Sequence, residues 1–235
     1  LVTGNTIVLK PHEATPLCTL EFCKILDEVG LPAGVINVIT GEGATVGSHL
    51  VSSPITKLVT VTGSIRAGQA IYKAAAENVT ALCLELGGKA PFIVLEDADL
   101  DKAVEAAVIS RYANCGQVCI CNEMVLVHKS IAEAFTERVV EKVKALTYGD
   151  PMSDVHMGPT VTASGIKRVE EMVKTSVEQG ARLICGGKRP EGEAYAKGNW
   201  YEPTVLTGVT PDMPLAREEI FAPVLPIVEI DSYEH

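Results

Sequence analysis

Three cysteines stand close together near the middle of this 235-residue chain, at Cys115, Cys119 and Cys121. Zinc sites usually combine two separated C-x-x-C blocks. Here the spacing is C-x-x-x-C-x-C and only His128 lies nearby, so no metal site is predicted. A nucleophilic thiol is the better chemical interpretation, and it requires a thiolate, a neighbouring base and access to a substrate. Packing in the interior remains the commoner role for any single cysteine of this segment.

A single carboxylate, Glu85, interrupts the apolar run 81–86 just before the pair Gly87-Gly88. Burial of an unpaired carboxylate is costly, and it would tune the group towards the basicity that a general base needs at neutral pH. The alternation of a strand equally allows Glu85 to point outward at the end of that strand. The residues alone leave both interpretations open.

Two glycine-containing turns could face a phosphate. In the first, Gly43 and Gly47 belong to the pattern G-x-G-x-x-x-G, one residue longer than the usual dinucleotide fingerprint. The second is Thr62-Gly63-Ser64, in which Ser64 is a natural N-cap. Both turns follow a predicted strand and open a helix, where backbone N–H groups could bind a phosphate. Tight-turn glycines and an ordinary helix terminus are the alternatives.

Lys10 and Glu13 flank Pro11 at the end of another predicted strand. Ligands of α/β proteins usually bind at the carboxyl ends of parallel strands. Glu13 could accept two hydrogen bonds from ribose hydroxyls there. A solvated loop pair is the alternative, and these residues taken alone favour it.

A regular alternation of strand and helix patterns must position these residues. Asp99 is an expected N-cap, and Ser130-x-x-Glu133 is an expected capping box. Strands separated by helices of this length predict parallel sheets. Gly87-Gly88 is the expected hinge between two α/β domains, residues 1–87 and 88–235. The expected strands are 6–9, 35–39, 58–61, 91–95, 124–128 and 200–206, and the expected helices are 17–29, 44–50, 65–78, 100–108, 131–146 and 166–177.

Composition narrows the class of protein. The formal net charge is −10 and the 20 basic residues are scattered, which argues against a nucleic-acid or anionic-membrane partner. No apolar run reaches the roughly 18 residues that span a bilayer. The seven cysteines form no disulfide framework, which indicates reduced thiols in a cytoplasmic protein. The chain begins without Met and ends in mid-pattern, so we expect a piece of a longer polypeptide.

Taken in order, these motifs resemble those of the aldehyde dehydrogenase superfamily over essentially the whole chain. Residues 84–89, Leu-Glu-Leu-Gly-Gly-Lys, resemble the family's Glu signature, and residues 116–119, Gly-Gln-Val-Cys, resemble its Cys signature. The Cys-x-Cys pattern looks closest to lactaldehyde and glycolaldehyde dehydrogenases, of which the chain would be a central segment. Three further motifs match the family's cofactor contacts: Lys10-Pro11-x-Glu13, Thr62-Gly63-Ser64 and Glu218-Glu219-Ile220-Phe221.

The resemblance implies a fold and a mechanism. The fold would be a Rossmann-like parallel-sheet cofactor domain followed by a second α/β catalytic domain, incomplete at both ends of the chain. Cys119, as thiolate, would attack an aldehyde to give a thiohemiacetal, with its own backbone N–H facing the oxyanion. Hydride transfer to NAD(P) would leave a thioester, and Glu85 would activate the water that hydrolyses it. Cys115 and Cys121 would line or pack the site.

The resemblance also implies a dinucleotide and an assembly. Glu13 beside the adenosine ribose favours NAD because it would repel a 2′-phosphate, although Lys10 keeps NADP compatible. Ala222 replaces the family's usual glycine after Phe221, and its methyl group would tighten the nicotinamide pocket. A homo-oligomer, dimer or tetramer, is expected. The implied cofactor contacts are Lys10, Glu13, Gly43, Gly47, Thr62, Gly63, Ser64, Leu86, Glu219 and Phe221.

Two rival functions stay open. One is a Cys-dependent thioesterase or hydrolase that uses Cys119 and Glu85 without redox chemistry, although the ribose-binding pair and the glycine turns argue against it. The other is an inert fragment that binds only nucleotide or partner subunits, because the family's upstream asparagine segment and its C-terminal part are absent. The residues do not identify the aldehyde.

Overall fold

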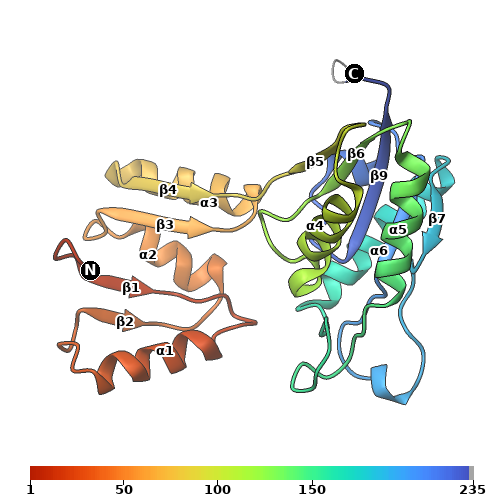
Figure 1. Cartoon of the computed structure of the whole chain (residues 1–235). Coiled ribbons are helices and arrows are strands. Elements are labelled where there is room, and N and C mark those ends of the chain that lie inside the picture. Colours follow the sequence, from red (N-terminus) through yellow and green to blue (C-terminus); the bar gives the residue numbers. More distant parts are fainter. Residues whose placement is uncertain (233–235) are drawn as a thin grey trace. The chain divides into compact units, whose positions relative to one another are not determined.

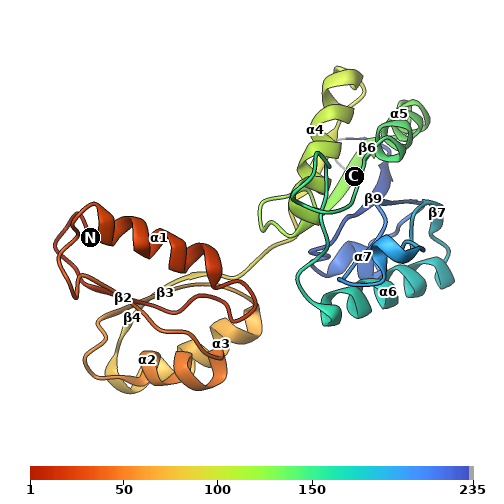
Figure 2. The same cartoon turned by 90° about the horizontal axis from the view of Figure 1, so that it is seen from below.

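The computed structural model describes residues 1–232, and residues 233–235 lie outside the described part. The chain divides into two compact units, Leu1–Gly87 and Gly88–His235 (Figures 1 and 2). The division falls at the glycine pair Gly87-Gly88. Within residues 1–232, none of the helices has the length and apolar character that crossing a membrane requires.

The first unit consists of two parallel strand pairs, each closed by a helix. Strand β1 (Ile7–Leu9) pairs with β2 (Ile36–Val38), and α1 (Leu17–Glu28) connects them. Strand β3 (Leu58–Thr62) pairs with β4 (Ala81–Glu85) through α3 (Ile65–Ala75) and a 3-10 turn at Ala76–Asn78. A π-helical turn, Gly43–Gly47, and α2 (Ser48–Ser52) join the two pairs. Parallel pairing places the carboxyl ends of both strands of a pair at the same edge.

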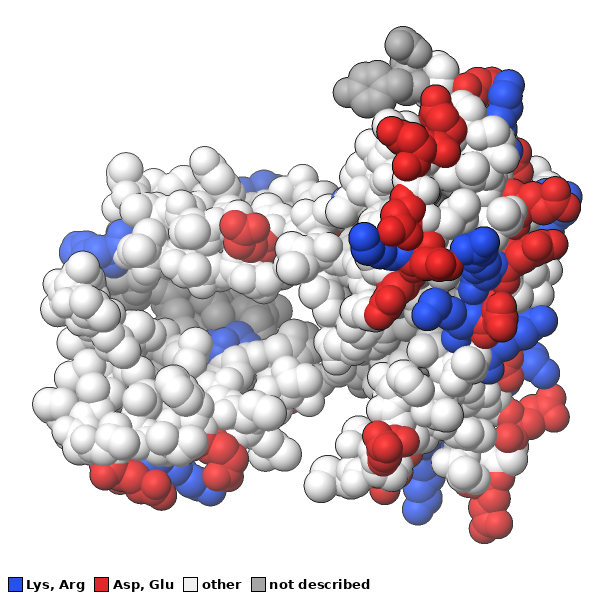
Figure 3. Space-filling view, viewed as in Figure 1, with Lys and Arg blue, Asp and Glu red and all other residues white. Residues whose placement is uncertain are grey.

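The first unit buries few side chains. Its buried residues are Pro11, Val51, Gly68, Ala75 and Thr80. Apolar strand residues stay open, since Val8 is 54% and Leu58 is 59% exposed. The face of this unit that Figure 3 shows is mostly uncharged, whereas charged side chains crowd the visible face of the second unit.

The second unit is a three-layer α/β structure. Its sheet has the order β5-β6-β9-β8-β7, and all neighbours are parallel except the antiparallel pair β7–β8. The strands are β5 (Pro91–Val94), β6 (Met124–His128), β7 (Arg182–Cys185), β8 (Thr204–Thr207) and β9 (Val224–Ile230). The helices are α4 (Leu100–Tyr112), α5 (Ala132–Lys144), α6 (Ala163–Glu178) and α7 (Pro214–Arg217), with short 3-10 turns at Ala113–Gly116 and Glu193–Tyr195.

Two apolar clusters lie on opposite faces of this sheet. Helices α4 and α5 pack on one face and α6 on the other, as Figure 2 shows. Because side chains alternate along a strand, Val205 and Leu225 join the α4–α5 cluster while their neighbours Leu206 and Val224 join the α6 cluster. Burial on both faces explains why the first five residues of β9, Val224 to Val228, are all apolar.

The predicted α/β fold with parallel sheets is confirmed. Of the predicted helix caps, two are confirmed and one is wrong. Ser64 caps α3 by accepting from the Ala67 N–H, and Asp99 caps α4 through Lys102 N–H. The predicted capping box at Ser130 is wrong. Helix α5 begins at Ala132 without a side-chain cap, because the Ser130 hydroxyl lies 2.8 Å from Nδ1 of His128 instead.

Candidate active site

Cys119 lies on a turn that reverses the chain after α4. Within the 3-10 turn that ends α4, Asn114 (φ 50°), Cys115 (φ 59°) and Gly116 (φ 70°) all have left-handed backbone conformations. For residues other than glycine this conformation costs on the order of 1–2 kcal/mol each. The turn ends in a half-buried stretch from which Cys119 emerges on the surface.

Ala222 and Arg111 approach the backbone of Gly116 so closely that a residue with a side chain would not fit there. A Cβ atom there would stand 2.3 Å from the Ala222 carbonyl oxygen and 2.5 Å from Nη2 of Arg111. The same Arg111 nitrogen donates to the Gly116 carbonyl at 2.7 Å. The glycine of the Cys signature is therefore the point at which the turn packs against the segment before β9.

The three clustered thiols differ in accessibility. Cys119 is exposed, whereas Cys115 and Cys121 are buried. Burial raises the pKa of Cys115 to about 11, although its thiol donates to the Gly158 carbonyl at 3.0 Å. Burial also raises the pKa of Cys121, and the positive charge of Arg111 opposes that effect. Of these thiols, Cys119 alone is open to attack a substrate.

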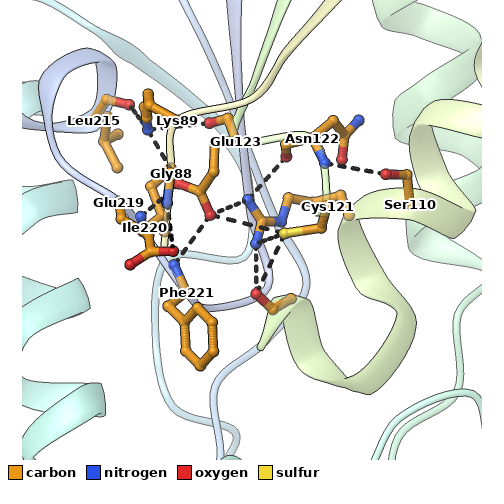
Figure 4. Close-up of polar contacts among 12 residues, drawn as sticks. Gly88, Lys89, Ser110, Cys121, Asn122, Glu123, Leu215, Glu219, Ile220 and Phe221 are labelled. Carbon is orange, nitrogen blue, oxygen red and sulfur yellow. Dashed lines mark hydrogen bonds and ion pairs between the residues drawn. The ribbon is translucent and has the colours of Figure 1, made fainter. Parts of the chain in front are cut away.

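A buried cluster of charges lies beneath this turn (Figure 4). The Glu123 carboxylate is 1% exposed and lies 3.0 Å from Nη1 of Arg111, whose side chain is fully buried. Lys89 approaches the other carboxylate oxygen at 3.2 Å. Burial alone would raise the pKa of Glu123, but Arg111, the Ile220 N–H and Lys89 together hold it below its usual value. Glu123 is therefore a carboxylate at neutral pH.

The predicted cofactor-contact segment Glu219–Phe221 is attached to this cluster. Glu123 accepts from the backbone N–H of Ile220 at 2.5 Å and from that of Phe221 at 3.2 Å. The carboxylate of Glu219 accepts from the Gly88 N–H at 3.2 Å. Phe221 is 40% exposed, and its backbone has φ 52°. The structure thus brings Glu219, Phe221 and the last residues of the Glu signature together.

In the first unit, Glu85 occupies the last position of β4 and is exposed. Its carbonyl accepts from the Gly63 N–H at 2.8 Å, so Glu85 and the turn Thr62-Gly63-Ser64 share one edge of the β3–β4 pair. Leu86 packs against α3, where a Cβ on Gly68 would meet its methyl carbon at 2.5 Å. The exposed strand-end interpretation of Glu85 fits this position, and its role as a base remains a prediction.

The second predicted group of cofactor residues gathers at the β1–β2 edge. The ammonium of Lys10 donates to the carbonyls of Pro11 and of Gly41, the latter at 3.1 Å, and lies 3.7 Å from the Glu13 carboxylate. A Cβ on Gly47 would touch the Lys10 chain at 3.9 Å, so this glycine lies beside it. The pKa of Glu13 is lowered, chiefly by a hydrogen bond from its own backbone and by His12. Gly43 begins the π-helical turn.

Sequence reasoning missed Arg111 and Glu123. The signal was present for Arg111, because the buried residues Val104, Ala107, Val108 and Arg111 continue one helical stripe, and a charge in an apolar stripe needs a partner. Glu123 has no comparable signal, since its partners lie near 89, 111 and 220. Among residues 1–232, no cluster of three or more His, Cys, Asp or Glu side chains could hold a metal ion.

Comparison with known proteins settles the family. The model of the aldehyde dehydrogenase family matches residues 1–235. The chain belongs to the aldehyde dehydrogenase family. It is 49% identical to a 3,6-anhydro-alpha-L-galactose dehydrogenase of Vibrio sp. (strain EJY3) and 49% identical to a lactaldehyde dehydrogenase of Escherichia coli (strain K12).

These matches cover the whole of this chain but only 49% and 48% of the two relatives. The chain therefore spans about half the length of the curated aldehyde dehydrogenases that it matches. Solved structures agree. A 3,6-anhydro-L-galactose dehydrogenase in complex with NAP superposes with a TM-score of 0.96, covering 99% of this chain and 49% of that one. The lactaldehyde dehydrogenase from Escherichia coli gives 0.94, covering 99% and 48%.

Proposed function

We propose that the whole protein oxidises an aldehyde to a carboxylic acid with NAD(P), and that Cys119 is the nucleophile. The observation that carries this proposal is that only one thiol in the cluster of three, that of Cys119, is exposed. It lies on a turn in which Gly116 leaves no room for a side chain. Family membership supports the reaction type. The exposed position of Cys119 and the burial of Cys115 and Cys121 support the choice of thiol.

In the proposed reaction, the Cys119 thiolate adds to the aldehyde carbonyl and forms a thiohemiacetal. The backbone N–H of Cys119 faces the developing oxyanion. Bound NAD(P) supplies the hydride acceptor. The carbon of the thiohemiacetal is thereby oxidised to a thioester on Cys119, and Glu85 takes a proton from the water that cleaves it. The acid leaves and the thiol is restored.

The residues at the strand ends of the first unit fit a dinucleotide. Ser64 caps α3, and no acidic side chain stands in the first turn of that helix, so its positive end is available to a pyrophosphate. Glu13 is ionised at neutral pH because its pKa is lowered, and it can accept from ribose hydroxyls. That charge favours NAD over NADP, while the nearby Lys10 keeps NADP compatible.

For the roles of the two units, we propose nucleotide binding for residues 1–87 and catalysis for 88–235. A small hydroxylated aldehyde is the proposed substrate class, because the two relatives at 49% identity are named for lactaldehyde and for 3,6-anhydro-alpha-L-galactose. The free cysteines of the chain suit a reduced, cytoplasmic setting. A homo-oligomer is part of the same proposal.

The first test is the formation of reduced cofactor by the whole protein with lactaldehyde or glycolaldehyde. We expect Cys119→Ala to lower kcat/KM at least about a thousandfold, because the covalent step disappears. Cys18→Ala, which removes another exposed thiol, is the matched control and should retain activity. Full activity in Cys119→Ala would overturn the assignment, and ester hydrolysis without any cofactor reduction would favour the thioesterase.

Glu85→Gln tests the second half of the reaction. If Glu85 activates the water, the variant still forms the thioester but cannot turn it over. Rapid-mixing kinetics should then show a burst of reduced cofactor of about one equivalent per site, followed by a steady state that is slower by about two to four orders of magnitude. A variant that loses the burst and the steady state together would contradict a role confined to hydrolysis.

A further inference from the structure

The segment Glu219–Phe221 is held from two sides by side chains outside the motifs. On one side, Glu123 accepts from the N–H groups of Ile220 and Phe221. On the other, the guanidinium of Arg168 in α6 donates to the carbonyls of Glu219 and Ile220, both at 2.7 Å. Ile220 therefore has its N–H and its C=O fixed by oppositely charged groups.

This double attachment acts where the backbone is strained. Phe221 has φ 52°, a conformation that costs a residue other than glycine free energy and persists only when its surroundings impose it. Glu123 and Arg168 supply that constraint, since the peptide before Phe221 cannot rotate without breaking hydrogen bonds to charged groups. As a result Phe221 is exposed while the residues on either side of it, Ile220 and Ala222, are buried.

We call Glu123, Arg168 and their hydrogen bonds to residues 219–221 the clamp. The clamp is linked to the Cys119 turn through Arg111. Arg111 pairs with Glu123 and donates to the carbonyls of Gly116 at 2.7 Å and Asn122 at 2.9 Å, one on each side of Cys119. Arg168 takes no part in these contacts. A change at Arg168 therefore loosens the 219–221 segment without touching the turn, which separates the two effects experimentally.

We propose that Arg168 and Glu123 are positioning residues that set the affinity for the nicotinamide half of the cofactor by fixing Glu219 and Phe221. The inference rests on the proposed function, in which Glu219 and Phe221 contact that half. Neither Arg168 nor Glu123 lies in the motifs named in the sequence analysis, and neither needs to touch the cofactor. Their effect passes through the backbone of Ile220 and Phe221.

The decisive variant is Arg168→Met, which keeps the apolar stem of an exposed residue. It removes both hydrogen bonds to the Glu219 and Ile220 carbonyls, together with a contact to the Met172 sulfur. Lys167→Met, an exposed cation on the same helix, is the matched control. We expect Arg168→Met to raise the Kd for reduced cofactor about tenfold, because two charged hydrogen bonds no longer hold the segment. The rate at which iodoacetamide alkylates Cys119 should equal that of the control, and Arg168→Lys should give an intermediate Kd.

Other outcomes overturn the proposal. An unchanged Kd, or a lowered melting temperature with an unchanged Kd, would make the clamp merely structural. If the parent protein binds no cofactor at all, the proposed function fails, and that result is distinct from parent and variant binding equally well. Glu123→Gln is a second test of the proposal. Its side-chain amide places an NH2 donor where a carboxylate oxygen now accepts from a backbone N–H, so one of the two hydrogen bonds to Ile220 and Phe221 is lost. We expect it to raise the Kd at least as far as Arg168→Met does.

Discussion

Glu123 combines nearly complete burial with a negative charge, and its surroundings explain how. Each carboxylate oxygen has a cation and a backbone N–H within hydrogen-bonding distance, from Arg111 and Phe221 on one oxygen and from Lys89 and Ile220 on the other. Burial lowers the pKa of Lys89, and the Glu123 carboxylate opposes this effect. A buried charge that loses its partner destabilises the fold strongly. Removing either Glu123 or Arg111 should therefore lower the free energy of unfolding by more than their ion pair contributes to it.

The lowered pKa of Glu123 predicts a pH dependence of stability. A carboxyl group whose folded pKa lies below its ordinary value of 4.5 stabilises the fold above that pH, and the contribution is lost as the pH falls towards the folded pKa. We expect Glu123→Gln to lower the free energy of unfolding by about 3–5 kcal/mol at neutral pH. The difference from the parent should shrink below pH 4.5.

Urea unfolding followed by the fluorescence of Trp200, the single tryptophan, measures this difference within the second unit. Glu170→Gln is the control, because Glu170 pairs with Arg189 at the surface at 2.7 Å. Such an exposed pair should contribute less than about 1 kcal/mol. A deficit in Glu123→Gln that stayed constant from neutral pH to acid would show that its charge is not responsible.

At the scale of elements, the end of α4 determines where Cys119 lies. The helix could not continue through Asn114, Cys115 and Gly116, because all three have positive φ. Arg111, in the last turn of α4, then ties the carbonyls of the reversed chain to the helix. A helix terminus and a buried guanidinium, rather than the packing of its own side chain, thus position the proposed nucleophile.

Gly116→Ala tests this arrangement. The new methyl group would overlap the backbone oxygen of Ala222, and φ 70° would be strained in addition. We expect a loss of about 2–4 kcal/mol of stability together with slower alkylation of Cys119, because the turn must shift. Gly149→Ala is the control, since its Cβ would meet Val155 at an ordinary 3.5 Å. Parent-like melting and alkylation in Gly116→Ala would show that the turn tolerates displacement.

Capping motifs show how far local reasoning reaches at this scale. Ser64 and Asp99 are N-caps, as their sequence context predicts. Each has an extended backbone, and its side chain accepts a hydrogen bond from the backbone N–H three residues later. Ser130 meets the same description but is drawn to His128. Pro226 is a residue that local reasoning would place outside a central strand, yet it lies within β9. It lies where β9 changes from pairing with β8 to pairing with β6 from Ile227 onward.

At the scale of the whole chain, the two units differ in how completely they bury their apolar residues. The second unit packs both faces of its sheet, whereas the strands of the first leave Ile7, Val8 and Leu58 exposed. Alternating strands and helices predicted both units, since parallel pairs need helical connections. The strands β7 and β9 were absent from the prediction, and β4 was only one of two interpretations of the apolar run 81–86. The places of β7 and β9 in the sheet depend on partners far along the chain.

The sequence by itself determined the local features of this protein: alternating strands and helices, the helix cap at Ser64, the glycines of the turns and the two signatures that mark its family. These depend on residues within a few positions of one another. Only the tertiary structure decided which of three thiols is exposed, and that Glu123, Arg111 and Arg168 hold the Glu219–Phe221 segment. The partners of Glu123 lie up to 98 residues away. Long-range charge pairing leaves no periodic trace in a sequence, because it depends on where a folded backbone brings distant groups.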